Sequence, residues 1–170
     1  MLEFQPILDG WSLEICGFEA LVRWQHPSMG RLPPDAFIGE LEPLGLVEAL
    51  DVWVLNQACI CAGKWQRAER EALTVAVNVS AYSFQRRDFP DLVHSILERT
   101  GLASTCLEIE IIESIALERP ERAALSIDRL RDQGVRVMLD DFGTGFSSLK
   151  HVRQLPCDGI RSDPSFVVDV

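Results

Sequence analysis

The pattern of apolar and polar positions predicts an alternation of strands and helices along the chain. Two apolar segments, 2–8 and 12–24, flank the turn residues Asp9-Gly10, which is a β-hairpin signal. Apolar residues then recur at helical spacing through 46–68. Further predicted helices cover 35–45, 90–101, 120–134 and 147–155, and further predicted strands cover 74–80, 106–113, 135–140 and 157–163.

This order of elements indicates a single α/β domain. A hairpin followed by alternating helices and strands is typical of βαβ units, in which the sheet is mainly parallel. No low-complexity segment, internal boundary or sequence repeat divides the 170 residues. We therefore expect one domain over 1–170, and the 47% of apolar residues are ample for its core.

The charge of the chain limits its partners. The formal net charge is −10, from 26 Asp and Glu against 16 Lys and Arg. A field of this sign does not attract a nucleic acid polymer or an anionic membrane. A small anionic ligand would need local help, from metal ions or from a few placed arginines.

Two further features indicate the cellular compartment. The first residues, MLEFQPILDG, lack the regions of a signal peptide, and no apolar run approaches the roughly 20 residues of a membrane span. The five cysteines are an odd number without the spacing of a disulfide framework. We therefore expect a cytoplasmic protein that has reduced thiols and no membrane segment.

The segment VMLDDFGTG, at 137–145, places two adjacent carboxylates where a buried strand is predicted to end. Asp140 and Asp141 repel each other there, and a shared site raises the pKa of one of them. A positive group is therefore expected beside them. Such carboxylates can hold a pair of metal ions about 3.5–4 Å apart, an arrangement that clamps a phosphodiester and lowers the pKa of a bound water.

Counting this strand, five successive predicted strands carry polar residues toward one end, where parallel α/β folds gather their chemistry. On any one strand such a residue more often caps a helix or faces solvent, but five strands in succession favour a common site. Its oxygen ligands suit Mg²⁺ or Mn²⁺ better than Zn²⁺, and the three histidines show no ligand spacing. The polar residues concerned are Glu19 and Arg23, which share a strand face with Leu21, then Asn78 and Ser80, Glu108 and Glu110, Asp140 and Asp141, and Arg161 and Asp163.

The segment FEALVRW at 18–24 resembles the signature of the EAL domain family, which comprises phosphodiesterases and receptors of cyclic di-GMP. The resemblance extends in register over essentially the whole chain. Other matching segments are QP at 5–6, GFEALVRWQHP at 17–27, GL at 45–46, WVLNQAC at 53–59, VNVSA at 77–81, LEIEIIES at 107–114, LDDFGTGFSSL at 139–149 and GIRSDPSFV at 159–167.

This resemblance implies a modified TIM barrel whose first strand is antiparallel to the others. It also implies metal-assisted hydrolysis of one phosphodiester of cyclic di-GMP to linear pGpG, with Mg²⁺ or Mn²⁺ as the cofactor and Ca²⁺ as an inhibitor. By the same resemblance, the catalytic positions are Glu19, Asp140, Asp141 and Arg161, the metal ligands are Glu19, Asn78, Glu110, Asp140 and Asp141, and the ligand-binding positions are Gln5, Leu21, Arg23 and Asp163.

The chain departs from the family pattern in three places. The family's threonine is Ile112 here, and the lysine that assists the attacking water is Arg161. Arginine keeps its charge but, with a pKa above about 12, it cannot accept a proton. The chain also ends at Val170, after the sixth predicted strand, whereas the family continues through two more βα units. We therefore expect an incomplete barrel of six strands out of eight, without the later Glu that supports the second metal and the Gln near the ligand.

These departures leave three functions open. The first, which we favour, is a metal-dependent cyclic di-GMP binder with impaired or no hydrolysis. The second is an active phosphodiesterase that produces pGpG, and the third is a protein-interaction module that has lost the ligand. Because an incomplete barrel leaves strand edges and apolar faces open, we also expect a homo-oligomer.

Overall fold

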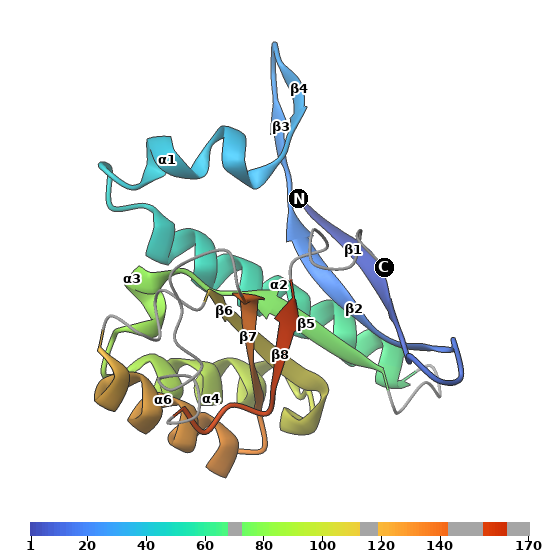
Figure 1. The fold of residues 1–170 in the computed structure, drawn as a ribbon. Helices are drawn as coiled ribbons and strands as arrows, with labels where there is room; N and C mark the ends of the chain where they lie inside the picture. Colours follow the sequence, from blue (N-terminus) through green and yellow to red (C-terminus); the bar gives the residue numbers. More distant parts are fainter. Residues whose placement is uncertain (68–72, 113–118, 143–154, 163–170) are drawn as a thin grey trace.

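The computed structural model describes residues 1–67, 73–112, 119–142 and 155–162. Its main element is a six-stranded sheet with the order β1-β2-β5-β6-β7-β8 (Figure 1). The strands are β1 (Leu2–Leu8), β2 (Ile15–Val22), β5 (Thr74–Asn78), β6 (Leu107–Ile112), β7 (Arg136–Phe142) and β8 (Gly159–Ser162). Strand β1 runs antiparallel to β2, and every later neighbour is parallel. The prediction of a mainly parallel sheet with an antiparallel first strand is therefore confirmed.

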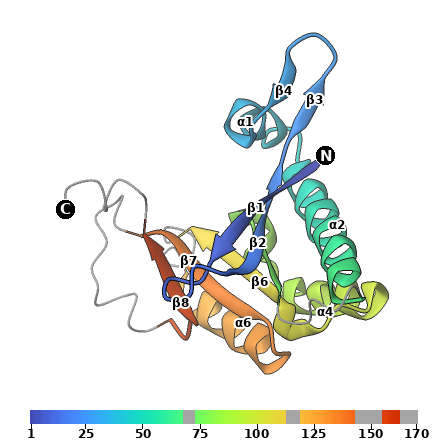
Figure 2. The ribbon, with the colours of Figure 1, turned by 90° about the vertical axis from the view of Figure 1, so that its right-hand side faces the viewer.

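Three helices cover one face of this sheet, as the two views in Figures 1 and 2 show. They are α2 (Val47–Arg67), α4 (Phe89–Thr100) and α6 (Pro120–Asp132). Their buried apolar side chains share one core with alternate residues of β5, β6 and β7. Because side chains alternate along a strand, the remaining residues of these strands point to the opposite face. Members of the core include Leu55, Val75, Val77, Ile96, Ile109, Ile111, Ile127, Val137 and Leu139.

The ends of α4 and α6 follow the proline and glycine signals in the sequence. Each helix has a proline at its first turn, Pro90 in α4 and Pro120 in α6. Gly101 ends α4 with a φ of 69°, and Gly134 follows α6 with a φ of 89°. Such values suit glycine, which has no Cβ to clash in the left-handed region. None of the described helices is both long and apolar enough to cross a membrane.

The first hairpin differs from its prediction at the turn. The second strand begins at Ile15, not at residue 12, because Asp9 organises a longer polar turn. One oxygen of its carboxylate accepts hydrogen bonds from the backbone N–H groups of Trp11 and Ser12, at 3.0 and 2.8 Å. These bonds hold the chain away from the ladder and lower the pKa of Asp9.

The connection from β2 to α2 contains structure that the sequence pattern did not predict. The residues between the predicted strand 12–24 and the predicted helix 35–45, together with Trp24, form a two-stranded ribbon of β3 (Trp24–His26) and β4 (Gly30–Leu32). The predicted helix 35–45 is broken into η1 (Pro34–Ala36) and α1 (Ile38–Leu41). Such short pieces contain too few residues to show a period, so local turn chemistry decides them.

Two further differences lie near the strand ends. The strand predicted over 74–80 ends at Asn78, and Ser80 instead caps the short helix α3 (Ala81–Phe84) by accepting from the Ser83 N–H. A short turn, η2 (Ser104–Cys106), precedes β6. Most of the helix predicted over 147–155 lies outside the described residues.

Candidate functional site

Neighbouring strands place the predicted polar residues on the face of the sheet that the helices leave free. Gln5 of β1 pairs with Glu19 of β2, and Glu19 pairs with Ala76 of β5. Asn78 follows two residues later on the same face and pairs with Glu110 of β6. Residues that are paired in register lie on the same face, so β1, β2, β5 and β6 all contribute to one surface.

Asp140 and Arg161 extend this surface to β7 and β8. Met138 of β7 pairs with Glu110, and Asp140 stands two residues further along the same face. Gly159 of β8 pairs with Met138, and Arg161 again follows by two residues. Five successive strands, from β2 to β8 in the sheet order, therefore direct polar groups to one side. Two predicted positions, the side chain of Asp141 and the whole of Asp163, lie outside the described part of the chain.

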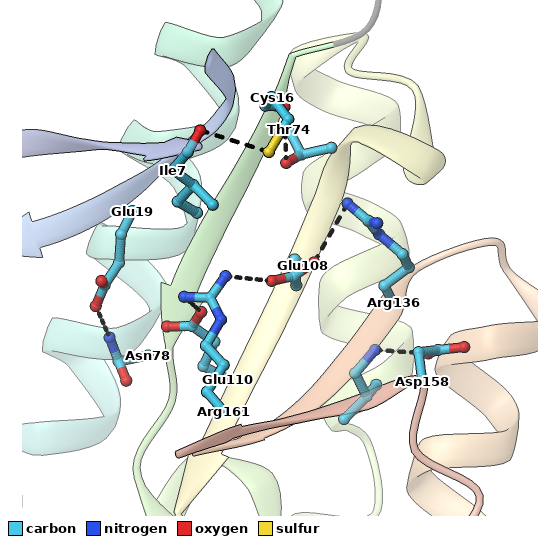
Figure 3. A network of polar contacts seen from close by, with 11 residues as sticks. Ile7, Cys16, Glu19, Thr74, Asn78, Glu108, Glu110, Arg136, Asp158 and Arg161 are labelled. Atoms are coloured by element: carbon cyan, nitrogen blue, oxygen red, sulfur yellow. Dashed lines mark hydrogen bonds and ion pairs between the residues drawn. The ribbon is translucent and has the colours of Figure 1, made fainter. Parts of the chain in front are cut away.

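Glu19 and Asn78 form a direct contact between β2 and β5 (Figure 3). The Asn78 side-chain amide donates a hydrogen bond to Glu19, with 2.8 Å between Nδ2 and Oε1. When the amide nitrogen is used in this way, the amide oxygen of Asn78 stays available to a cation. The two residues are thus suited to act together as oxygen ligands.

Glu110 is the most deeply buried acid of the site, with 0% of its surface exposed. Burial raises its pKa to about 8, the charge of Arg161 opposes this rise, and the negative charges of Glu19 and Asp140 add to it. Arg161 forms an ion pair with Glu110 through Nη1 and Oε1. The Oε2 atom of Glu110 has no hydrogen-bond partner among the described residues. Among the described residues, Glu110 is therefore a buried acid with other acids nearby and with a positive partner at one of its two oxygens.

Glu108 joins two arginines on the same face (Figure 3). Its Oε1 lies 2.6 Å from Nη2 of Arg161, and its Oε2 lies 3.2 Å from Nη2 of Arg136. The strand pattern placed Glu108 beside Glu110 in the common polar site, but it did not indicate that Glu108 pairs with arginines. The pattern of polar strand ends did not indicate Arg136, because Arg136 is the first residue of β7. Only the register that pairs Glu108 with Arg136 reveals the contact.

These side chains fit a hard cation in their chemistry. Carboxylate and amide oxygens are the ligands that Mg²⁺ and Mn²⁺ prefer, and among the described residues Oε2 of Glu110 has no hydrogen-bond partner, so it is an oxygen that a cation could contact. Within the described residues, however, no three His, Cys, Asp or Glu side chains are close enough together to hold a metal ion. Arg161 occupies the position beside Glu110 instead.

A cavity of about 510 Å³ lies next to this polar face, at the carboxyl ends of β2, β5 and β6. Leu21 and Asn78 line it, together with apolar residues of η1, α1 and α2.

Asp51 of α2 also lines this cavity, and the pattern of polar strand ends did not indicate it, because it lies within a helix. Its Oδ2 accepts hydrogen bonds from the N–H and hydroxyl of Ser80, at 3.2 and 2.5 Å, so it fixes the turn that follows Asn78. Burial raises the pKa of Asp51, and the bonds from Ser80 partly offset this rise.

Arg23 follows Leu21 by two positions, just beyond the end of β2, and already has partners. Its Nε donates to Oε2 of Glu3 at 3.1 Å, and its Nη1 donates to the carbonyl of Val22 at 2.9 Å. Arg31 pairs with the other oxygen of the same Glu3. Arg23 is thus held at the carboxyl end of β2 by its ion pair with Glu3.

The EAL domain family model matches residues 1–170 of this chain. The chain belongs to the EAL domain family. An uncharacterized signaling protein of Caulobacter vibrioides is 44% identical over 170 residues, and the cyclic di-GMP phosphodiesterase NbdA of Pseudomonas aeruginosa is 43% identical over 169. This EAL domain spans only 20% and 22% of the length of those two relatives.

Solved structures of the family share this fold. A PaMucR phosphodiesterase in complex with c-di-GMP matches with a TM-score of 0.93 and 33% identity, over 98% of this chain and 68% of that one. The EAL enzyme Bd1971, in a form bound to cAMP and cyclic di-GMP, matches with a TM-score of 0.88 and 29% identity, over 98% and 46%. The TIM-barrel-like EAL fold predicted from the sequence is therefore confirmed. In the described part of the chain its sheet is open, with β1 and β8 as outer strands.

Proposed function

We propose that this EAL domain binds cyclic di-GMP together with Mg²⁺ or Mn²⁺, and hydrolyses it slowly or not at all. The observation that carries the proposal is the cavity of about 510 Å³ that adjoins the polar face at Asn78. A cyclic dinucleotide has flat apolar bases and two charged phosphodiesters, so it needs an apolar cavity beside a polar, cation-binding surface. The similarity to the PaMucR complex with c-di-GMP supports the same ligand.

The chain offers distinct groups to the two parts of such a ligand. Leu21, Pro34 and Ile38 give the cavity an apolar wall that suits a guanine base. Arg23 can pair with a phosphodiester through two parallel N–H groups after it exchanges Glu3 for the ligand. Gln5 stands opposite Glu19 on β1 and can add a hydrogen bond from that edge.

Glu19, Asn78, Glu110 and Asp140 are the residues that would hold the cation, with Asp141 on the second-metal side by family resemblance. When bound, the cation would polarise the phosphodiester and lower the pKa of a water molecule. The protein's own part is to supply oxygen ligands from neighbouring strands and to keep Glu110 out of bulk water.

Arg161 is the reason to expect impaired hydrolysis. A guanidinium keeps its proton, so it cannot act as a general base. It is also engaged by Glu108 and Glu110 and is not free to orient a water molecule. Loss of a general base typically costs about 10²–10⁴-fold in rate, which leaves binding as the main remaining activity.

An active phosphodiesterase is the second candidate. The retained Glu19, Asn78, Glu110 and Asp140 on one face favour it, since they supply most of the cation ligands. A protein-interaction module that has lost the ligand is the third reading. It predicts that neither the dinucleotide nor the cation binds.

Calorimetry with cyclic di-GMP in the presence of Ca²⁺, followed by product analysis in Mg²⁺ and Mn²⁺, separates these readings. The proposal expects binding with little or no pGpG. Rapid formation of pGpG by the purified chain would establish the phosphodiesterase instead. Absence of binding in every cation would leave the interaction module.

A further inference from the structure

Arg161 reaches across a neighbouring strand to its acidic partners. The strand order is β6-β7-β8, so a side chain of β8 that contacts β6 must pass over β7 (Figure 3). One guanidinium nitrogen, Nη2, lies 2.6 Å from Oε1 of Glu108, and the other, Nη1, pairs with Oε1 of Glu110. Because the two acids stand two residues apart on one strand face, the fork of a guanidinium can engage both at once.

Glu108 is the acidic partner that holds Arg161 in place. Only 5% of its surface is exposed, and Arg136 pairs with its second oxygen at 3.2 Å. Both of its oxygens therefore have a positive partner, and it has little need of a further cation. Arg161 is left as the positive group that Glu108 holds beside Glu110.

Glu110 is the acidic partner of Arg161 that a cation could also bind. It is completely buried, its Oε2 lacks a hydrogen-bond partner among the described residues, and the charges of Glu19 and Asp140 lie near enough to affect it. The single positive charge of Arg161 offsets the negative charges of Glu110, Glu19 and Asp140 only in part. A divalent cation that binds Glu110 must enter the space beside Arg161, and the two positive groups repel each other at short range in a poorly solvated site.

We propose that Arg161 is a built-in counter-ion of Glu110, which Glu108 positions and which a divalent cation must displace before it can bind. This inference rests on the proposed cation site and deepens it by naming the residue that sets its affinity. A guanidinium stays charged at every accessible pH, so Arg161 itself keeps its positive charge beside Glu110. A lysine would present a single nitrogen and could not engage both acids through a planar fork.

The test is the affinity of the full chain for Mn²⁺, measured by calorimetry and by electron paramagnetic resonance of the free ion. Arg161→Gln removes the competing charge, and we expect it to bind Mn²⁺ at least about tenfold more tightly than the wild type. Arg136→Gln is the matched control, because Arg136 pairs with Glu108 but not with Glu110. Its Mn²⁺ affinity should stay within about twofold of the wild type.

Glu108→Gln tests the role of Glu108 in positioning Arg161, and it provides a second test if Arg161→Gln does not fold. It leaves the charge of Arg161 in place but releases one of its two partners, so Arg161 moves aside more easily. We expect Glu108→Gln to bind Mn²⁺ a few fold more tightly than the wild type, which is a smaller gain than that of Arg161→Gln. The double variant should bind Mn²⁺ as tightly as Arg161→Gln alone. This absence of additivity is what a role through Arg161 predicts, and a purely structural role would not produce it.

The outcomes distinguish this inference from the function on which it rests. Equal or weaker Mn²⁺ binding by Arg161→Gln, together with clear binding by the wild type, would overturn the counter-ion role and leave the cation site intact. Failure of both proteins to bind Mn²⁺ would overturn the cation site and the inference with it. Binding that appears only in Arg161→Gln would support the inference in its strongest form.

Discussion

The Asn78 side chain at the end of β5 donates a hydrogen bond to Glu19 of β2, with 2.8 Å between the two atoms. The residues are 59 positions apart in the sequence, and no local pattern connects them. The contact turns two strand ends into one polar unit, and the pairing of Asn78 with Glu110 attaches that unit to β6.

Removal of the Asn78 amide should weaken cation binding. Asn78→Ala deletes one oxygen ligand and leaves Glu19 without its donor, so we expect the Mn²⁺ affinity to fall by about tenfold. Asn56→Ala is a suitable control, because Asn56 is bonded to Arg99 on the helix side of the sheet. Calorimetric titration of both variants measures the effect, and equal affinities would argue against Asn78 as a ligand.

The stability of the chain should depend on the protonation of Glu110. Its pKa is about 8 in the folded chain against an ordinary value of 4.5, so between these values the unfolded chain releases a proton that the folded chain keeps. Stability from this group is fully present below pH 4.5 and is lost as the pH rises to about 8, by up to about 1.4 kcal/mol per pH unit. Urea unfolding of the wild type and of Glu110→Gln across this range measures it.

The stabilities of the wild type and of Glu110→Gln should change differently with pH. Glu110→Gln stays neutral, so its stability relative to that of the wild type should rise from pH 5 to pH 8. Glu121→Gln, on the exposed side of α6, should keep the wild-type slope. Parallel profiles for the wild type and Glu110→Gln would mean that Glu110 is ionised throughout and that Arg161 compensates it fully.

Arg23 should contribute more to the binding of cyclic di-GMP than its neighbour Arg31. Both pair with Glu3, but 18% of the Arg23 side chain is exposed against 60% of Arg31, and Arg23 lies at the carboxyl end of β2, close in sequence to Leu21 of the cavity. Charge-assisted hydrogen bonds to a phosphate suggest a loss of about ten- to hundredfold in affinity for Arg23→Met. Arg31→Met should bind nearly as well as the wild type. Similar losses in both variants would indicate a general charge effect.

The contact between Ser80 and Asp51 should stabilise the fold and the site together. Ser80→Ala removes a hydroxyl donor from a buried carboxylate, which we expect to cost about 1–3 kcal/mol of unfolding free energy. The turn after Asn78 loses a restraint, so Mn²⁺ affinity should fall as well. Ser95→Ala, at an exposed position of α4, should change neither quantity. Denaturant unfolding and Mn²⁺ titration of both variants would reveal whether the two effects occur together.

The outer strand β8 should take part in self-association. Ile160 pairs with Leu139, whose side chain belongs to the helix-side core, yet 45% of Ile160 is exposed at this edge. We expect an oligomer in solution, and Ile160→Asp should dissociate it. Leu125→Asp on α6, where 66% of the leucine is exposed, is the control that should not. Light scattering that shows a stable wild-type monomer at micromolar concentrations would contradict the prediction.

The sequence by itself determined the class of fold and most of its elements. The long helix α2, the proline-to-glycine helices α4 and α6, and the apolar strands all show periods that their length makes visible. The same periods placed Glu19, Leu21 and Arg23 on one strand face, and the motif FEALVRW indicated the family that the comparisons confirm. These features depend on residues that are close together in the sequence, so they could be predicted without the tertiary structure.

Only the tertiary structure decided which charges neutralise which. Arg161 stands in the sequence near Asp163, far from Glu108 and Glu110, and its contact with them depends on the strand order and on the register of β7. Arg136 and Asp51 have roles that no strand-end pattern could indicate, because one opens a strand and the other lies in a helix. Ion pairs and buried hydrogen bonds join residues that are distant along the chain, and their energy depends on burial, which appears only when the sheet and its helices are assembled.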